Sequence, residues 1–259
     1  AEQPAIARAS ALALLRDPSQ PAAAHALAAG LRSEDPLLRL GALEASTRVD
    51  PFSRGVLVKP LLSDPLRALR IEAARALADL PPDALPAEER RRLERGLAEY
   101  RSAQLANAEH PSAHVNLALL ALRRGDLAAA RAAYETALRI GPWFVPAWVN
   151  LADLERQQGR EAAAEDRLRQ GLALAPESAE LHHALGLSLV RQERLEESLA
   201  ELGRAATLAP EQPRYAYVYA VGLHSAGRQG EALAVLAQAR ALHPGDPDLR
   251  AAEAAYQQE

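Results

Sequence analysis

Residues 145–178, VPAWVNLADLERQQGREAAAEDRLRQGLALAPES, set a 34-residue pattern that residues 179–212, AELHHALGLSLVRQERLEESLAELGRAATLAPEQ, follow without insertion. Proline marks the same point of the pattern every 34 residues, at Pro142, Pro176, Pro210 and Pro244. Proline stops a helix because it lacks an N–H group and clashes with the preceding turn. The period therefore predicts four units of two helices each over residues 111–246.

Columns of small and large side chains follow the same period. Small residues let paired helices approach closely, and a larger residue fills the space between layers. The small columns are Ala118, Ala152, Gly186 and Ala220; Ala130, Ala164, Ser198 and Ala232; and Ala137, Gly171, Ala205 and Ala239. The large column is Tyr134, Leu168, Leu202 and Leu236. A turn column holds Gly125, Gly159 and Gly227, with Glu193 as its exception. The columns predict stacked helical hairpins with an alanine-lined core.

This pattern closely resembles the tetratricopeptide (TPR) family, with repeats at 111–144, 145–178, 179–212 and 213–246. Trp148 stands where the signature Trp of the family is expected, and the other repeats replace it with His114, His182 and Ala216. Glu155 stands where the family prefers Tyr, which puts local packing in question. The resemblance implies an all-α fold, an α-α superhelix or solenoid.

The columns extend beyond the four repeats. Gly96, Tyr100 and Ala103 lie 34 residues before members of the first repeat, which predicts a connecting helix within 86–110. Residues 247–259 predict a capping helix, with Leu249 covering the last repeat, because solenoid ends need such caps for solubility.

Residues 1–85 carry a looser period. Arg8, Arg39 and Arg70 lie 31 residues apart, and Asp-Pro pairs at 35–36 and 64–65 precede the second and third of them. Asp accepts free N–H groups as a helix cap and Pro suits the first helical position, so each pair predicts a helix start. The segment resembles HEAT repeats, with generic helical hairpins as the alternative. The Pro-rich turn at 80–86 predicts that both arrays form one superhelix.

Composition excludes several classes of function. The 30 basic and 34 acidic residues are interspersed and the net charge is −4, so no nucleic-acid footprint is present. The absence of cysteine excludes disulfides, thiolate metal sites and Cys-x-x-Cys-His haem attachment within this sequence. No apolar run approaches the ~18 residues that a membrane span needs. No nucleophile elbow, phosphate-binding Gly loop or His-Glu-x-x-His motif appears, so we expect no enzyme and no catalytic residues.

The resemblance also implies a binding surface. In TPR proteins the first helix of each repeat lines a concave groove that holds a protein or peptide partner. The corresponding residues here are Val115, Asn116, Leu119 and Leu122; Val149, Asn150, Asp153 and Arg156; His183, Leu187 and Val190; and Tyr217, Val221 and His224. In several TPR proteins an Asn at the position of Asn116 and Asn150 bonds the backbone of an extended peptide, since an amide both donates and accepts. The alternative is that both amides bond within their own repeat or are solvated.

Other side chains allow more than one interpretation. An acidic ligand could pair with Arg123, Arg156, Arg191 or Arg214, although an arginine on an exposed helix is usually just solvated. Trp143 and Phe144 suit either a plug between repeats or a hot spot for a partner. His182, His183 and His224 suggest a metal or haem site, but adjacent helical residues do not face the same way. We expect no metal and no cofactor.

The order of HEAT-like helices, Pro-Pro turn and TPR repeats resembles the C-terminal region of certain bacterial multihaem c-type cytochromes. That resemblance implies an exported, periplasmic module, with a cytoplasmic location as the alternative. The sequence starts at Ala1 without Met, and its first helix lacks a polar cap. We therefore expect an upstream domain or a partner to cover the N-terminal edge. The rival functions are an assembly element that oligomerises through its ends and a metal- or haem-binding accessory protein.

Overall fold

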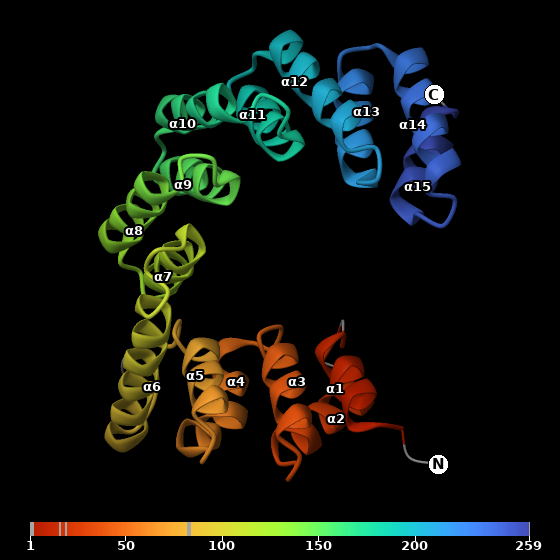
Figure 1. The fold of residues 1–259 in the computed structure, drawn as a ribbon. Coiled ribbons are helices and arrows are strands. Elements are labelled where there is room, and N and C mark those ends of the chain that lie inside the picture. Colours follow the sequence, from red (N-terminus) through yellow and green to blue (C-terminus); the bar gives the residue numbers. More distant parts are fainter. Residues whose placement is uncertain (1–2, 16, 19, 82–83, 259) are drawn as a thin grey trace. The chain divides into compact units, whose positions relative to one another are not determined.

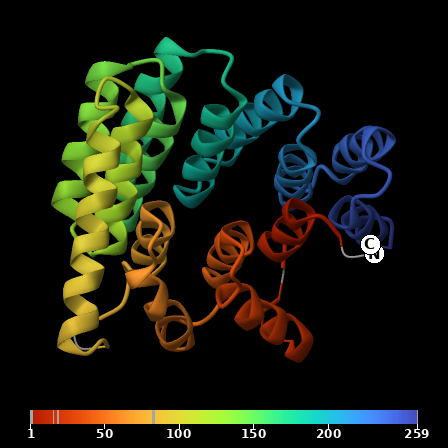
Figure 2. The same ribbon diagram turned by 60° about the horizontal axis from the view of Figure 1, so that its bottom comes forward.

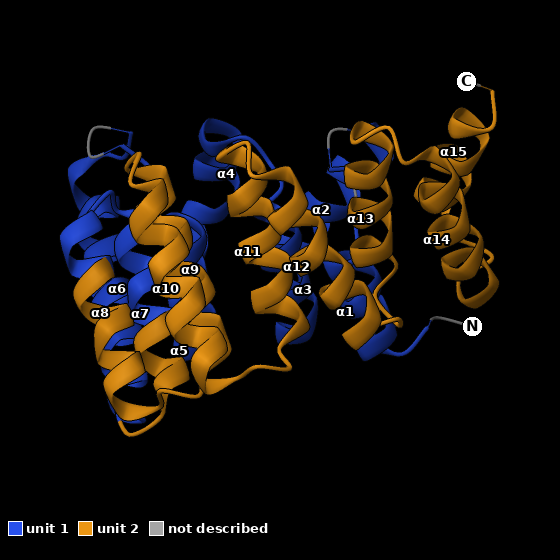
Figure 3. Cartoon of the chain, turned by 90° about the horizontal axis from the view of Figure 1, so that it is seen from above, with its two compact units in different colours: residues 1–108, 116–130 blue, residues 109–115, 131–259 orange. Residues whose placement is uncertain are grey.

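A computed structural model describes residues 3–15, 17–18, 20–81 and 84–258. Within these ranges the regular structure consists of fifteen α-helices and one short 3-10 helix, with no strand (Figure 1). The predicted fold class, an all-α solenoid of the α-α superhelix type, is confirmed. The chain divides into two compact units, residues 1–108 with 116–130 and residues 109–115 with 131–259 (Figure 3).

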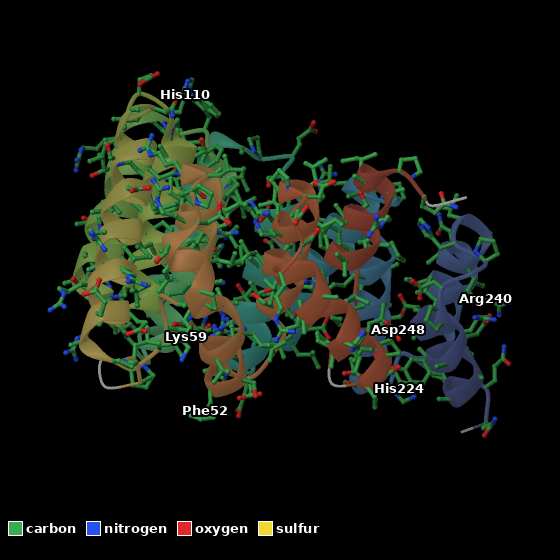
Figure 4. The ribbon with its side chains drawn as sticks, turned by 90° about the horizontal axis from the view of Figure 1, so that it is seen from below. Phe52, Lys59, His110, His224, Arg240 and Asp248 are labelled. Atoms are coloured by element: carbon green, nitrogen blue, oxygen red, sulfur yellow. The ribbon has the colours of Figure 1, made fainter. Side chains whose placement is uncertain are left out.

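Unit 1 contains a run of short helices followed by one long one. Its helices are α1 (Ala5–Ala13), α2 (Pro21–Leu31), α3 (Pro36–Ser46), α4 (Pro51–Val58), the 3-10 helix η1 (Lys59–Ser63), α5 (Arg67–Ala76) and α6 (Ala87–Leu105). Buried leucine and alanine side chains, from Leu27 to Leu97, form one continuous core beneath them. On the outside, Ile6 and Leu14 near the N-terminal end are 62% and 74% exposed, and Phe52 on α4 is also exposed (Figure 4).

One of the two predicted Asp-Pro helix starts is confirmed and the other is wrong. Asp35 caps α3, and its carboxylate accepts a hydrogen bond from the Leu37 N–H at 2.9 Å. Helix α5, by contrast, begins only at Arg67, with no side-chain cap. The buried Asp64 carboxylate forms an ion pair with Arg39 at 2.9 Å, and the one backbone N–H group that donates to it is that of Leu66, before the helix begins. A packing requirement therefore outweighs the local capping preference at this position.

Arg39 and Arg70, two of the arginines spaced 31 residues apart, make equivalent contacts. Arg39 donates to the carbonyl oxygens of residues 33 and 34, and Arg70 donates to those of residues 64 and 65. Each also pairs with a carboxylate further along the chain, Arg39 with Asp64 and Arg70 with Glu99. Each guanidinium thus fixes the loop before its own helix and ties that helix to the next layer, which gives the period a physical reason.

Unit 2 contains most of the 34-residue repeats. Its complete helices are α9 (Val145–Gln157), α10 (Glu161–Leu174), α11 (Ala179–Arg191), α12 (Leu195–Leu208), α13 (Pro213–Ser225), α14 (Gln229–Leu242) and α15 (Pro247–Tyr256), while α7 (Pro111–Arg123) and α8 (Leu127–Ile140) are divided between the units. From α9 onward each helix packs on the next (Figures 1 and 2, green to blue). The first helices of the repeats, α9, α11 and α13, share one face of this unit.

Burial confirms the packing that the periodic columns predict. Every residue of the three small columns and of the large column is buried, including Tyr134 and Leu236, which are fully inaccessible. Helix α15 packs on the last repeat, with Leu249 fully buried against the core of α13 and α14. An ion pair between Arg240 (Figure 4) and Glu253 adds to this contact.

The turn between the two helices of a repeat requires a left-handed backbone. Gly125, Gly159 and Gly227 have φ angles of 75°, 72° and 74°, and Glu193 adopts the same region at 60°. A residue with a Cβ is strained there by roughly 1 kcal/mol. Glu193 therefore forms the turn against its own preference, because the helices on both sides fix it.

Candidate functional site

A cleft of about 380 Å³ opens on the face shared by α9, α11 and α13. It brings together six of the predicted binding positions: Val149, Asn150, Asp153, Arg156, His183 and Leu187. Among the lining residues outside the predicted binding positions are Glu180 and Tyr215, which lie three residues before His183 and two before Tyr217, the first inward positions on their helices. The second and third repeats thus provide most of one continuous surface, and the fourth closes it.

The charged side chains of the cleft differ in what they already bind. Arg156 pairs with Asp153 at 2.7 Å, and Arg191 pairs with Glu161 at 2.8 Å. Arg214 is exposed and makes no hydrogen bond or ion pair with any residue that the structure describes. The cleft therefore offers one uncommitted positive charge at the end formed by α13.

The two asparagines of the predicted ladder are not equivalent. The Asn116 amide donates a hydrogen bond to Gln104 Oε1 at 3.0 Å, within unit 1. The side-chain amide of Asn150, which is half-buried in the cleft, bonds to no side chain or backbone group among the described residues. The intramolecular alternative thus describes Asn116, whereas the Asn150 amide is free to bond a ligand.

His183 gives the cleft a neutral aromatic wall. Its ring lies 4.6 Å from the Tyr215 ring, and its Nδ1 atom has no hydrogen-bond partner in the described structure. Burial, together with the nearby Arg214 charge, lowers the pKa of His183 to about 4, so the imidazole is uncharged at neutral pH. Partial loss of hydration raises the pKa of Glu180 above its ordinary value.

The structure does not bring the three histidines of the metal hypothesis together. His182 points away from the cleft, with Nδ1 at 2.5 Å from the Glu201 carboxylate and Nε2 donating to the Pro176 carbonyl at 2.9 Å. His224, on α13 (Figure 4), stacks on Tyr256 with the ring centroids 3.8 Å apart. Within the described ranges, no group of three or more metal-ligating side chains is gathered in one place.

The remaining predicted positions lie outside the cleft. They are Val115, Asn116, Leu119, Leu122, Val190, Tyr217, Val221 and His224. Val115 is buried, while Leu119 and Val190 are 42% and 43% exposed. Tyr217 lines a separate hollow together with Asp246 and Asp248.

Of the two interpretations of Trp143, the plug between repeats does not agree with the structure. Its side chain is 66% exposed and makes an edge contact with Phe144, with ring centroids 6.0 Å apart. The turn after Pro142 directs the indole outward, so the core of the repeat closes without it.

Glu155, at the position where the family prefers Tyr, is the most buried acidic side chain of the described structure, with 2% exposure. Its carboxylate pairs with Arg131 and with Arg160, the latter at 2.6 Å. Chiefly through the hydrogen bond from Arg131, these guanidinium groups lower the pKa of Glu155 to about 2. The ion pairs take the place of an aromatic side chain, so this residue supports the fold beneath the cleft.

Comparison with known sequences identifies the family. Residues 121–187, and separately residues 84–142 and 183–247, match the tetratricopeptide repeat family. Together these matches span more than half of the chain, which belongs to that family. The match that begins at residue 84 includes α6, so the family pattern extends upstream of residue 111. No curated protein matches the sequence.

Comparison with solved structures finds similar helical repeat proteins. The crystal structure of TTC0263, a thermophilic TPR protein in Thermus thermophilus, is 26% identical, with a TM-score of 0.51, over 65% of this chain and 92% of that one. MamA from Desulfovibrio magneticus RS-1 is 17% identical over 76% of this chain and 98% of its own, with a TM-score of 0.49. YrrB, described as a TPR protein with an unusual peptide-binding site, is 19% identical over 70% of this chain and 90% of its own, with a TM-score of 0.46. Within the described ranges, no helix of this chain combines the length and apolar character needed to cross a bilayer.

Proposed function

We propose that this protein is a non-catalytic interaction scaffold that binds an extended peptide segment of a partner in the cleft of α9, α11 and α13. The observation that carries the proposal is the unpaired Asn150 amide inside a cleft that three successive repeats line. Membership of the TPR family supports a scaffold rather than an enzyme.

Each part of the cleft suits one part of such a ligand. The Asn150 amide can donate to a peptide carbonyl and accept from a peptide N–H, as a neighbouring strand would. Val149, Ala184 and Leu187 offer an apolar floor for one side chain. Arg214, free of internal partners, suits a carboxylate of the ligand, because charge-assisted hydrogen bonds are the stronger ones.

The finer organisation belongs to the same proposal. We infer HEAT-like repeats over residues 1–85, supported by the matching roles of Arg39 and Arg70. We also infer four repeats at 111–144, 145–178, 179–212 and 213–246, a connecting helix within 86–110 and a capping helix at 247–259, supported by the order of helices α6 to α15. An exported, periplasmic setting beside a multihaem cytochrome domain rests on the sequence resemblance alone.

A partner or further segment that covers the N-terminal end is the second candidate role. Ile6 and Leu14 are exposed there, and large apolar side chains on a surface often mark contact sites. If that partner is a second copy, light scattering at rising concentration will show a dimer, and a mass that stays monomeric will exclude self-association.

The cleft can be tested with a selected peptide. A random 12-residue peptide library on phage is panned against the whole chain, and one selected peptide is measured by fluorescence polarisation. Asn150→Ala is expected to weaken binding about 10-fold, since it removes up to two backbone hydrogen bonds. Asn116→Ala is the matched control, because that amide is already bonded to Gln104, and it should leave the affinity unchanged. Equal affinity of the wild type and Asn150→Ala would exclude the cleft as the binding site.

A further inference from the structure

The position of the signature Trp is filled differently in successive repeats. Trp148 Nε1 donates to the Pro142 carbonyl at 2.8 Å, and its ring lies so close to Gly171 that a Cβ there would approach Cγ to 2.9 Å. In the next repeat His182 takes the same place and bonds the Pro176 carbonyl. In the last repeat the position holds only Ala216.

A hollow of about 320 Å³ remains beside Ala216. It lies between α12, α13 and α14, which are neighbours in Figure 1, and all three belong to unit 2. Its lining includes Ala206, Ala216, Tyr219, Val235 and Leu242. The space that an indole occupies two repeats earlier is thus open to solvent here, and its walls are mostly apolar, with Thr207 and Gln238 as polar members.

The backbone group that a signature Trp would bond is already satisfied. His243, at the end of α14, donates through Nε2 to the Pro210 carbonyl at 2.8 Å. This contact supplies the missing hydrogen bond without filling the hollow. The repeat therefore retains its fold although its central side chain is absent.

The chemistry of the walls is also specific to this repeat. Val235 stands 34 residues after Glu201, the carboxylate that pairs with His182 in the preceding repeat. Replacement of His by Ala and of Glu by Val removes both polar partners from the hollow together. On its rim, Gln238 makes no side-chain hydrogen bond with any described residue.

We propose that this hollow binds one aromatic side chain of a partner protein. Trp148 demonstrates that the same backbone framework accepts an indole, and the Tyr219 ring provides a surface for an offset or edge contact with a second ring. A charged group would lose its hydration among these apolar walls without a counter-charge, which disfavours it. The Gln238 amide can bond a ring N–H or hydroxyl group at the rim. Because α12 and α14 do not line the cleft described above, this site is independent of the peptide-binding proposal.

The test uses small aromatic probes on the whole chain. Indole and N-acetyl-tryptophanamide are titrated by NMR, with N-acetyl-leucinamide as the aliphatic comparison. The aromatic probes are expected to shift the signals of Tyr219 and Val235 with a dissociation constant on the order of 1 mM. The leucine amide should bind at least 5-fold more weakly. Equal binding of the aliphatic amide would overturn the aromatic assignment, and absence of binding by all three probes would overturn the site.

Variants that fill the hollow make the test specific. Ala216→Trp should weaken indole binding more than 10-fold, because the new side chain takes its place. Ala206→Leu narrows the hollow from α12 and serves as a second variant should Ala216→Trp fold poorly. Ala237→Trp adds an indole at an exposed position of α14 outside the lining and should leave binding unchanged. Wild-type affinity in either filled variant would show that the probes bind elsewhere.

Discussion

The repeats at 145–178 and 213–246 place different residues at the same three structural positions. The first has Trp148, Glu155 and Gly171, whereas the second has Ala216, Leu223 and Ala239. Their helix pairs have equal lengths, and their inter-helix glycines share the same left-handed turn. A repeat therefore needs a hydrogen-bond donor for the proline carbonyl and enough side-chain volume to fill the space between its helix layers. Different side chains can meet each need.

The two repeats differ in how sensitive their stability should be to substitution. The second fills the Tyr position with Leu223, which is fully buried and needs no partner. The first places a carboxylate there and depends on two arginines to neutralise it. Because a buried unpaired charge is costly, the repeat at 145–178 should be the more sensitive to substitution.

The largest effect is expected for Glu155→Ala. The change leaves Arg131 and Arg160 without their partner and opens a gap, and we expect a loss of about 3 kcal/mol in the free energy of unfolding. Both arginines are partly exposed, so water can solvate them after the change, and the expected loss lies at the lower end of the range for breaking a buried ion pair. Urea unfolding followed by circular dichroism measures it. Glu155→Leu, which copies Leu223, should cost less than Glu155→Ala, and an equal cost would contradict the volume argument.

The same ion pair predicts a pH dependence. The pKa of Glu155 falls from 4.5 to about 2 on folding, so its contribution is complete above pH 4.5 and is lost as the pH drops toward 2. The difference in stability between wild type and Glu155→Leu should shrink over that interval. Glu197→Ala is the matched control, because the carboxylate of Glu197 is exposed and solvent screens its pair with Arg194.

Gly171→Ala should have the next largest effect. A Cβ at this position would lie 2.9 Å from Trp148 Cγ and 3.1 Å from Leu181, so the ring must shift. We expect a loss of about 2 kcal/mol, typical of overpacking in a core. In a Trp148→Ala background, which reproduces the Ala216 and Ala239 pair of the last repeat, the added methyl group should cost less than about 1 kcal/mol. Equal costs in both backgrounds would show that the ring is not the obstacle.

Much of this fold follows from the sequence because the signal is repeated. Each column of small residues has one member in each of the four repeats, spaced 34 residues apart, because a position that must hold a small side chain in one layer must hold one in the next. The failures come from single contacts between distant segments. The Asp-Pro pair at 64–65 predicts a helix cap, but the Asp64 carboxylate forms an ion pair with Arg39 instead.

The candidate cleft was only partly predictable for the same reason. The family pattern supplies the inward positions of α9 and α11, but it cannot tell Asn116 from Asn150. The difference depends on Gln104, which lies on α6 outside the four repeats. His243 lies outside every periodic column, so nothing in the sequence indicated that it would replace the hydrogen bond of the missing Trp.

The smallest effect is expected for His243→Ala, which removes that replacement. Pro210 is exposed and His243 is partly exposed, so water can replace part of the hydrogen bond and the loss should be about 0.5–1 kcal/mol. The informative measurement is the double variant with Ala216→Trp, assessed by urea unfolding. If the new indole bonds the carbonyl as Trp148 bonds Pro142, Ala216→Trp should stabilise the His243→Ala protein more than it stabilises the wild type. Additive effects would mean that the indole enters the hollow without reaching the carbonyl, and that volume alone distinguishes the last repeat from the second.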